Sequence, residues 1–188
     1  YLSSKITGDG FFVLTKSDSY VALYKMNFDL VVINRTAFEK EVDGTLHLQK
    51  NGKLLSITTS DSSLSVRVIG RDGVIEKSSS IYLSSPKIVL CYEKDETLNM
   101  FVNLEKSFVE VRYSDFYGFL SSDETVGKTI DEILPFNGGF AGIYLKNGEK
   151  FLFTADENAV VSFEKQLPPA GFTKILKNGE NLMLVSSQ

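Results

Sequence analysis

The stretch that decides the fold is Leu145-Lys146-Asn147-Gly148-Glu149-Lys150-Phe151, in which an Asn-Gly pair separates two short runs containing apolar residues. Both central residues of a type I′ turn need a positive φ, which Asn and Gly tolerate, so this pattern predicts a β-hairpin. The same Lys-Asn-Gly triplet recurs at Lys50-Asn51-Gly52 and at Lys177-Asn178-Gly179. We therefore predict a hairpin of this kind at all three places.

Similar turn signals divide the whole chain into short segments. Asp9-Gly10, Asp43-Gly44, Asp72-Gly73 and Asn137-Gly138 are further examples. Short strands with turn signals about every 8–12 residues favour a sandwich, barrel or propeller over alternating strands and helices. The strands that we expect span residues 11–15, 20–26, 28–33, 45–49, 53–59, 63–69, 73–77, 87–92, 97–103, 107–113, 140–145, 150–154, 159–164, 172–177 and 181–185.

Two segments have features of short helices. From Asp123 to Pro135, Val126, Ile130 and Ile133 fall on one helical face, and the two ends carry a capping residue and a proline. Near residues 35–42, Thr36 and Glu39 have the spacing of a capping box. The prediction is one or two short helices within the β fold.

Three landmarks of the first half recur in the second half and indicate a duplication. Asp18 matches Asp95 with an offset of 95 − 18 = 77, whereas the Asn-Gly turn at 51 matches the turn at 147 with an offset of 147 − 51 = 96. Asp61 matches Asp156 with an offset of 156 − 61 = 95. The halves match if the second carries 96 − 77 = 19 additional residues. We expect a first repeat half at 1–84 and a second at 85–188, with an inserted helical segment near 114–134. The serine-rich joint at 78–86 fits either an extended linker or a strand at 80–83 inside one continuous fold.

The predicted fold is all-β, with duplicated antiparallel hairpin units that form either a small β-propeller-like structure or paired β-sandwich or barrel units. The chain has 188 residues, of which 43% are hydrophobic and 23% are charged, as in ordinary globular proteins. Its net charge of −4 gives no electrostatic reason to expect nucleic acid or anionic membranes as partners. No apolar run approaches the roughly 18–20 residues of a membrane helix.

Residues for nucleophilic, metal or cofactor chemistry are scarce. His47 is the one histidine and lies between two leucines of a predicted strand, where we expect a surface side chain without a catalytic role. Cys91 is the one cysteine and lies in an apolar strand, where a thiol is normally a small buried hydrophobe. The sequence has no paired histidines, no CxxC and no calcium-loop motif. We predict no catalytic residues, no metal site and no cofactor.

Neighbouring carboxylates leave one enzymatic alternative open. Asp95 with Glu96, Asp123 with Glu124, Asp131 with Glu132 and Asp156 with Glu157 are candidates for a carboxylate-dependent hydrolase with a cleft between the two β halves. Asp18, Asp61, Asp95 and Asp156, however, recur at predicted turns, where aspartate hydrogen-bonds the local backbone. A role in turn formation is the favoured interpretation.

The densest aromatic stretch runs from Phe108 to Leu120, at the start of the expected insertion. Tyr and Phe are favoured anchors of protein interfaces, although they can equally fill a core. We single out Tyr113, Phe116, Tyr117 and Phe119 as the candidate binding site. The predicted function is a non-catalytic protein-interaction or structural module that binds a protein partner or self-associates, for instance as a subunit of a virion or surface complex.

Overall fold

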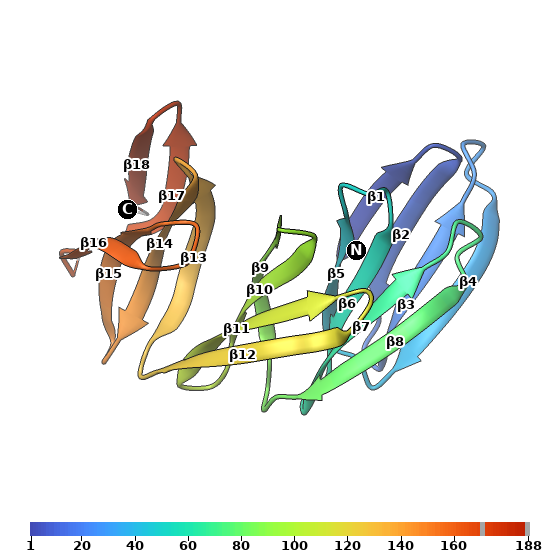
Figure 1. The fold of residues 1–188 in the computed structure, drawn as a ribbon, viewed down its shortest axis with the longest axis horizontal. Helices are drawn as coiled ribbons and strands as arrows, with labels where there is room; N and C mark the ends of the chain where they lie inside the picture. The colour runs from blue at the N-terminus through green and yellow to red at the C-terminus, as the bar shows by residue number, and fades with distance from the viewer. Residues whose placement is uncertain (170–171, 187–188) are drawn as a thin grey trace.

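The chain folds into five consecutive antiparallel β-sheets that stand side by side along an open arc (Figure 1). The structure is a computed structural model that describes residues 1–169 and 172–186. Within these ranges every regular element is a strand. The all-β prediction is therefore confirmed.

The sheets follow the order of the chain, and we number them accordingly. Sheet 1 contains β1 (Ser3–Thr7), β2 (Gly10–Lys16), β3 (Tyr20–Met26) and β4 (Val32–Glu39). Sheet 2 contains β5 (Asp43–Leu48), β6 (Leu54–Thr59), β7 (Ser63–Ile69) and β8 (Ile75–Tyr82). Sheet 3 contains β9 (Lys87–Lys94), β10 (Thr97–Asn103), β11 (Ser107–Ser114) and β12 (Gly118–Val126). Sheet 4 contains β13 (Thr129–Phe136), β14 (Gly139–Lys146), β15 (Glu149–Ala155) and β16 (Val161–Gln166). Sheet 5 is the hairpin of β17 (Phe172–Asn178) and β18 (Asn181–Ser186).

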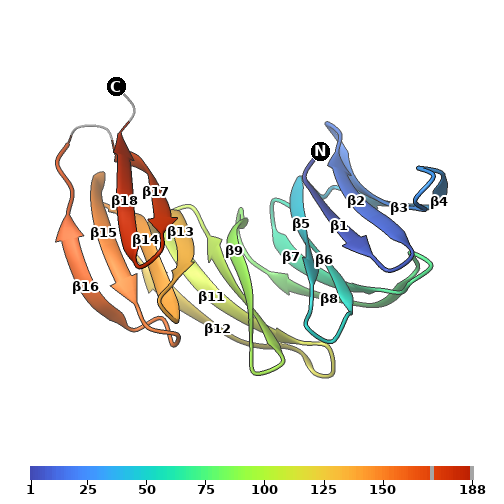
Figure 2. The same ribbon diagram turned by 90° about the horizontal axis from the view of Figure 1, so that it is seen from above.

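Each sheet is a simple meander whose first strand lies on the inner side of the arc. In sheets 1 to 4 every strand pairs only with its neighbours in sequence. The first strands β1, β5, β9, β13 and β17 contact one another in turn, which joins the sheets along their inner edges. Figure 2 shows the sheets spreading outward from this line. No sheet of the described residues closes on itself, so the barrel alternative is wrong.

The three hairpins predicted from Lys-Asn-Gly are confirmed, and they use different turns. They join β5 to β6, β14 to β15 and β17 to β18. Asn147 and Gly148 both have positive φ, of 52° and 80°, as a type I′ turn requires. At the first hairpin only Gly52 has a positive φ, and its N–H donates to the Gln49 carbonyl at 2.9 Å. A type I′ turn at Asn51 was therefore the wrong prediction, because the loop is one residue longer.

The second strands of sheets 2, 3 and 4 are buried on both faces, because each of these sheets is packed between two others. Four apolar clusters fill the four junctions between consecutive sheets. Leu14 and Leu23 of sheet 1 pack on Leu54 of sheet 2, whereas Leu55 on the other face of sheet 2 packs toward Met100 of sheet 3. The core is thus a series of layers between sheets.

Both helix predictions are wrong, since the described residues contain no helix. The segment from Asp123 to Pro135 forms the end of β12 and most of β13. A bulge between Ile130 and Glu132 shifts the register, so Ile130 and Ile133 face the same side of the strand although they are three residues apart. A spacing of three residues between side chains on one face is also typical of a helix, which explains the wrong prediction. Residues 35–39 continue β4, and the strands β1, β12 and β13 were not predicted.

The landmarks of the proposed duplication occupy different positions in the sheets. The turn at Asn51-Gly52 joins the first and second strands of sheet 2, whereas Asn147-Gly148 joins the second and third strands of sheet 4. Asp18 lies between the second and third strands of sheet 1, whereas Asp95 lies between the first and second strands of sheet 3. This matching of landmarks is wrong, and the structural repeat is one four-stranded sheet. The inserted helical segment near 114–134 is also absent, because β12 and β13 take its place.

The serine-rich joint does not interrupt the fold. Residues 78–82 belong to β8, and Leu83 and Ser85 donate backbone hydrogen bonds to Ser62 and Asp61 in the neighbouring turn. The apolar cluster between sheets 2 and 3 extends across this point in the chain. The division into domains 1–84 and 85–188 stays a prediction.

Candidate functional site

The four aromatic residues that the sequence singles out belong to the β11–β12 hairpin, where they form two pairs. Tyr113 is fully buried, and Phe119 packs edge to face on it with ring centroids 5.4 Å apart. Phe116 and Tyr117 lie in the turn, where Phe116 exposes 80% of its surface and Tyr117 exposes 76%. The first pair fills the core between sheets 2 and 3. The second pair is free to meet a partner.

The turn that carries Phe116 and Tyr117 is held against sheet 2. The Lys77 ammonium on β8 donates hydrogen bonds to the backbone carbonyls of Asp115 and Phe116 at 2.6 and 3.0 Å. The Lys53 ammonium forms an ion pair with the Asp115 carboxylate at 3.1 Å. The exposed rings contact each other edge to face, with centroids 4.8 Å apart. Two lysines of a neighbouring sheet thus fix the backbone beneath two solvent-exposed rings.

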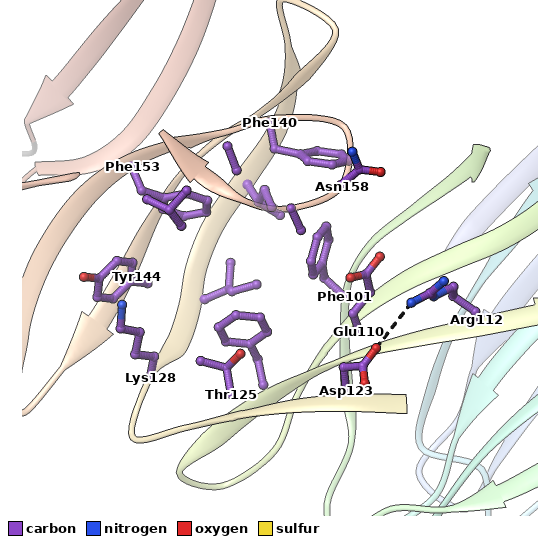
Figure 3. Close-up of a pocket in the computed structure, with 16 residues that line it drawn as sticks. Phe101, Glu110, Arg112, Asp123, Thr125, Lys128, Phe140, Tyr144, Phe153 and Asn158 are labelled. Carbon is purple, nitrogen blue, oxygen red and sulfur yellow. Dashed lines mark hydrogen bonds and ion pairs between the residues drawn. The ribbon is translucent and has the colours of Figure 1, made fainter. Parts of the chain in front are cut away.

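A second candidate site is a cavity of about 340 Å³ between sheets 3 and 4 (Figure 3). Cavities of this size accommodate small molecules. Side chains of both sheets form its mainly apolar wall: Phe101, Phe108, Ile130, Ile133, Phe140, Tyr144, Phe153, Ala155, Ala159 and Val161. Polar and charged side chains complete the lining: Glu110, Arg112, Asp123, Thr125, Lys128 and Asn158.

Two carboxylates face each other beside this cavity. Glu110 on β11 and Asp123 on β12 are direct cross-strand partners and point to the same face of sheet 3. Side chains in such positions have Cβ atoms about 4.5–5.5 Å apart. The Tyr92 hydroxyl donates to Glu110 at 2.8 Å, and the Arg112 guanidinium donates to Asp123 at 3.3 Å (Figure 3). Each carboxylate therefore accepts a hydrogen bond from a different side chain.

The opposite end of the cavity carries a cation beside an aromatic ring. The Lys128 ammonium lies 4.2 Å from the centroid of the Tyr144 ring and 3.3 Å from a carboxylate oxygen of Glu164. Figure 3 shows Lys128 and Tyr144 together, away from Glu110, Arg112 and Asp123. The cavity thus has an apolar middle and charged groups at each end, an arrangement that suits the binding of a small molecule.

His47 and Cys91 lie near a different cavity, of about 370 Å³, on the inner side of the arc. It lies between the two proposed halves, and Asp43 is the one carboxylate residue of its lining. Burial lowers the pKa of His47 below its usual range, an effect that Glu93 opposes. Burial also raises the pKa of the Cys91 thiol to about 12. The Cys91 thiol is therefore neutral, and Nε2 of His47 has no hydrogen-bond partner, so neither side chain shows the features of an activated nucleophile and its base.

The alternation of β12 separates the predicted carboxylate pair of Asp123 with Glu124, whereas Asp95 with Glu96 and Asp156 with Glu157 lie in turns between strands. Asp123 faces the cavity, whereas its neighbour Glu124 accepts a hydrogen bond from Ser107. Asp156 accepts backbone N–H bonds from Asn158 and Val160 at 2.8 and 2.9 Å, which is the turn role expected for it. The carboxylate pair that shares a face, Glu110 with Asp123, was not among the predictions.

Two kinds of feature are missing from the residues that the structure describes. These residues contain no group of three or more His, Cys, Asp or Glu side chains that could hold a metal ion. None of them forms a helix long and apolar enough to cross a membrane.

Comparisons with known proteins detect similarity in structure alone. No family model matches the sequence, and no curated protein matches it. A variant of prolyl oligopeptidase B from Galerina marginata, bound to a 35mer hydrolysis and macrocyclization substrate, has a TM-score of 0.60 at 13% identity over 95% of this chain and 29% of that one. An exo-beta-1,3-galactanase variant from Phanerochaete chrysosporium with beta-1,3-galactotriose has a TM-score of 0.58 at 14% identity over 96% of this chain and 54% of that one. The Dos1 propeller has a TM-score of 0.57 at 9% identity over 84% of this chain and 46% of that one.

The fold is β-propeller-like. Each four-stranded sheet corresponds to a propeller blade, and the first strand of each blade lies on the inner side. The chain spans less than two thirds of each of these three structures. The TM-scores of 0.57–0.60 support the shared fold. Sequence identities of 9–14% carry no activity over to this chain.

Sequence reasoning missed the cavity because its lining depends on register. Phe101 and Phe108 are far apart in sequence from Phe140 and Phe153, and the packing of sheet 3 on sheet 4 brings them together. The pairing of Glu110 with Asp123 follows from the register of β11 and β12. The predicted helix over residues 123–135 concealed that pairing, because β12 was not recognised as a strand.

Proposed function

We propose that this chain is a non-catalytic, β-propeller-like binding module that contacts a protein partner through the turn at Phe116 and Tyr117. The observation that carries the proposal is the exposure of two adjacent large aromatic residues, 80% and 76%, on a turn that is fixed from below. Aromatic side chains are enriched among the residues that dominate protein interfaces.

The fixed backbone of the turn supports binding for an energetic reason. A loop that is ordered only on binding loses conformational entropy at that moment, which weakens the complex. Here the hydrogen bonds from Lys77 and the ion pair from Lys53 order the turn beforehand. The rings of Phe116 and Tyr117 would therefore enter an interface with less entropic cost than on a free loop.

A pair of variants tests this proposal. Phe116→Ser combined with Tyr117→Ser should leave the melting temperature nearly unchanged, because both rings are exposed, and should abolish capture of proteins that the parent chain retains from a cell extract. Tyr82→Ser is the matched control, because Tyr82 is also an aromatic residue with 79% exposure and lies at the end of β8. Equal capture by the parent, the double variant and the control would contradict the role of the turn.

A second candidate function is hydrolysis of a glycoside by Glu110 and Asp123. The observation that favours it is that the two carboxylates are cross-strand partners beside a cavity with aromatic walls. Retaining glycosidases use two carboxyl groups about 5–5.5 Å apart. One of the similar folds is a galactanase with a beta-1,3-linked trisaccharide, although it shares only 14% of its residues with this chain.

Incubation with beta-1,3-galactotriose and a panel of other oligosaccharides tests this second candidate. Release of reducing ends by the parent chain, and its loss in Glu110→Gln and in Asp123→Asn, would support hydrolysis. Lys150→Gln is a suitable control, because Lys150 pairs with Asp131 outside the cavity lining. Absence of turnover by the parent chain would rule this candidate out and leave the binding proposal unaffected.

A further inference from the structure

A row of three side chains crosses sheet 3 on the face that packs toward sheet 4. Phe101, Glu110 and Asp123 are successive cross-strand partners on β10, β11 and β12, so they project from the same face of the sheet. Phe108 precedes Glu110 by two residues on β11 and shares this face. All four residues line the cavity between sheets 3 and 4. The register of sheet 3 thus places a carboxylate beside aromatic side chains in the wall of the cavity.

The charges that line the cavity leave Glu110 without an ion pair. Arg112 pairs with Asp123 at 3.3 Å, and Lys128 pairs with Glu164 at the same distance. No ion pair among the residues that the structure describes includes Glu110. The Glu110 carboxylate is therefore available to a cation that enters the cavity.

An aromatic cluster adjoins the Glu110 carboxylate. The Tyr92 hydroxyl donates a hydrogen bond to this carboxylate at 2.8 Å. Burial raises the pKa of Tyr92, and the hydrogen bond raises it further, so the donor is a neutral phenol. The Tyr92 ring stacks on Phe101 with centroids 5.8 Å apart, and the rings of Phe140 and Phe108 lie 5.3 and 6.3 Å from that of Phe101. Because aromatic rings attract cations within about 6 Å of their centroids, a cation here would meet a carboxylate and aromatic rings together.

Glu110 also marks the boundary between an apolar cavity and a polar one. A second cavity, of about 380 Å³, shares Glu110, Arg112 and Asn158 with the first. The rest of its lining consists of residues with polar or charged groups: Tyr92, Lys94, Asp95, Thr97, Asn99 and Glu157. Figure 3 shows Glu110 beside Phe101 at this boundary. A ligand with an apolar body in the first cavity would therefore present its polar group at Glu110.

We propose that the space between sheets 3 and 4 binds an organic ammonium cation, with its charged group at Glu110 and its apolar body among the phenylalanines. A cation is favoured over an anion because Arg112 and Lys128, the cationic side chains of the lining, already have carboxylate partners. The site is separate from the Phe116–Tyr117 turn. It depends on neither candidate function, because binding a cation requires no protein partner and no hydrolysis.

Three small molecules with the same phenylethyl body test the proposal on the parent chain. Phenethylammonium carries a positive charge, phenethyl alcohol carries none, and hydrocinnamate carries a negative charge. Titration of the isotope-labelled chain to about 10 mM of each compound, followed by the backbone amide shifts in NMR spectra, detects millimolar affinities. Phenethylammonium should bind about tenfold more tightly than the alcohol, because a hydrogen bond to a charged group contributes more than a neutral one. Hydrocinnamate should bind more weakly than either.

Variants of the two charged residues on β11 should change the affinity in opposite directions. Glu110→Gln should weaken the binding of phenethylammonium about tenfold and leave the binding of the alcohol unchanged, which also establishes that the variant is folded. Arg112→Gln should strengthen the binding of phenethylammonium by up to about fivefold, because Asp123 then loses its ion pair. Glu105→Gln is the matched control, because it removes the same charge in the turn between β10 and β11, outside the lining. It should bind like the parent chain.

The result on the parent chain alone can overturn the proposal, whichever variants fold. Equal affinities for phenethylammonium and the alcohol would show that the cavity selects only the apolar body. Tighter binding of hydrocinnamate would show that Arg112 and Lys128 dominate and that the ligand is an anion. Absence of binding by all three compounds up to about 10 mM would exclude the site. The Phe116→Ser, Tyr117→Ser variant should bind phenethylammonium like the parent chain, and a loss of binding in this variant would contradict the placement at Glu110.

Discussion

Gly142 on β14 is a position where one added methyl group should do measurable damage. It lies opposite Phe153 on β15 and opposite Ile133 on β13. A Cβ atom at Gly142 would lie 2.5 Å from Cε1 of Phe153 and 2.6 Å from the backbone oxygen of Glu132. The Phe153 ring thus covers the glycine, as aromatic residues often do across a strand pair.

The expected cost of Gly142→Ala follows from which atoms can move. The Phe153 ring can turn away, but it is 8% exposed and forms part of the apolar cluster between sheets 3 and 4. The Glu132 oxygen belongs to the backbone of a paired strand and cannot move without disturbing the sheet. Overpacking costs about 1–3 kcal/mol, and replacing glycine lowers the entropy of the unfolded chain by about 0.4–1 kcal/mol in the opposite direction. The net destabilisation should be roughly 1 kcal/mol.

Urea unfolding measures this difference through the midpoint at an unchanged m-value. In a thermal melt the same change corresponds to a fall of about 2–4 °C for a chain of this length. Gly8→Ala is the matched control, because no atom lies within 4 Å of its Cβ position and its φ is not positive. The control should be neutral or slightly stabilising.

A double-mutant cycle identifies the cause of the destabilisation. Phe153→Ala alone should cost about 3–5 kcal/mol as a truncation in the core. Combined with Gly142→Ala it should cost less than the sum by about 1 kcal/mol, because the ring that clashes is gone. A Gly142→Ala variant within about 0.5 kcal/mol of the parent, or a cycle without coupling, would refute the packing argument.

Three more predictions concern the turns and the titratable groups. Gly148→Val should destabilise the chain by about 1–2 kcal/mol in thermal melts, because Gly148 has a φ of 80°. Alkylation of Cys91 by iodoacetamide at pH 8 should be about 1,000-fold slower in the folded chain than in urea, since a pKa of about 12 leaves almost no thiolate. Burial lowers the pKa of His47, so the unfolded chain binds its proton more tightly, and stability should fall as the pH drops below about 6.5. His47→Gln should reduce this loss between pH 8 and pH 5, as measured by urea unfolding, and an unchanged pH dependence would contradict it.

The sequence predicts the hairpins well because their signals are local. Asn147 and Gly148 adopt the positive φ angles that their residue types tolerate, and most of the expected strands appear within a few residues of their predicted positions. At Gly142 the absence of a side chain lets the Phe153 ring pack so closely that a Cβ atom would lie 2.5 Å from it. These features depend on one turn or one pair of strands.

The errors of the prediction arise where packing between sheets decides the outcome. Ser65 alternates with apolar residues in β7, a pattern typical of a strand with one solvent-exposed face, yet Ser65 is buried. Arg67 on the same face is half-buried and pairs with Glu41 at 2.9 Å. The apolar segment around Cys91 predicts a central strand, yet β9 is the inner edge of sheet 3. Alternation of polar and apolar residues identifies a wet face only when one face of the sheet is exposed.

The same packing limits where this chain can act. Sheets 2, 3 and 4 have neighbours on both faces, so their faces are occupied by the core. A partner can reach two kinds of surface between these sheets: the turns at the strand ends and the gaps where two sheets diverge. Phe116 and Tyr117 represent the first kind, and the cavity beside Glu110 represents the second. Because the two are bounded by different residues, substitutions can disable one and leave the other intact.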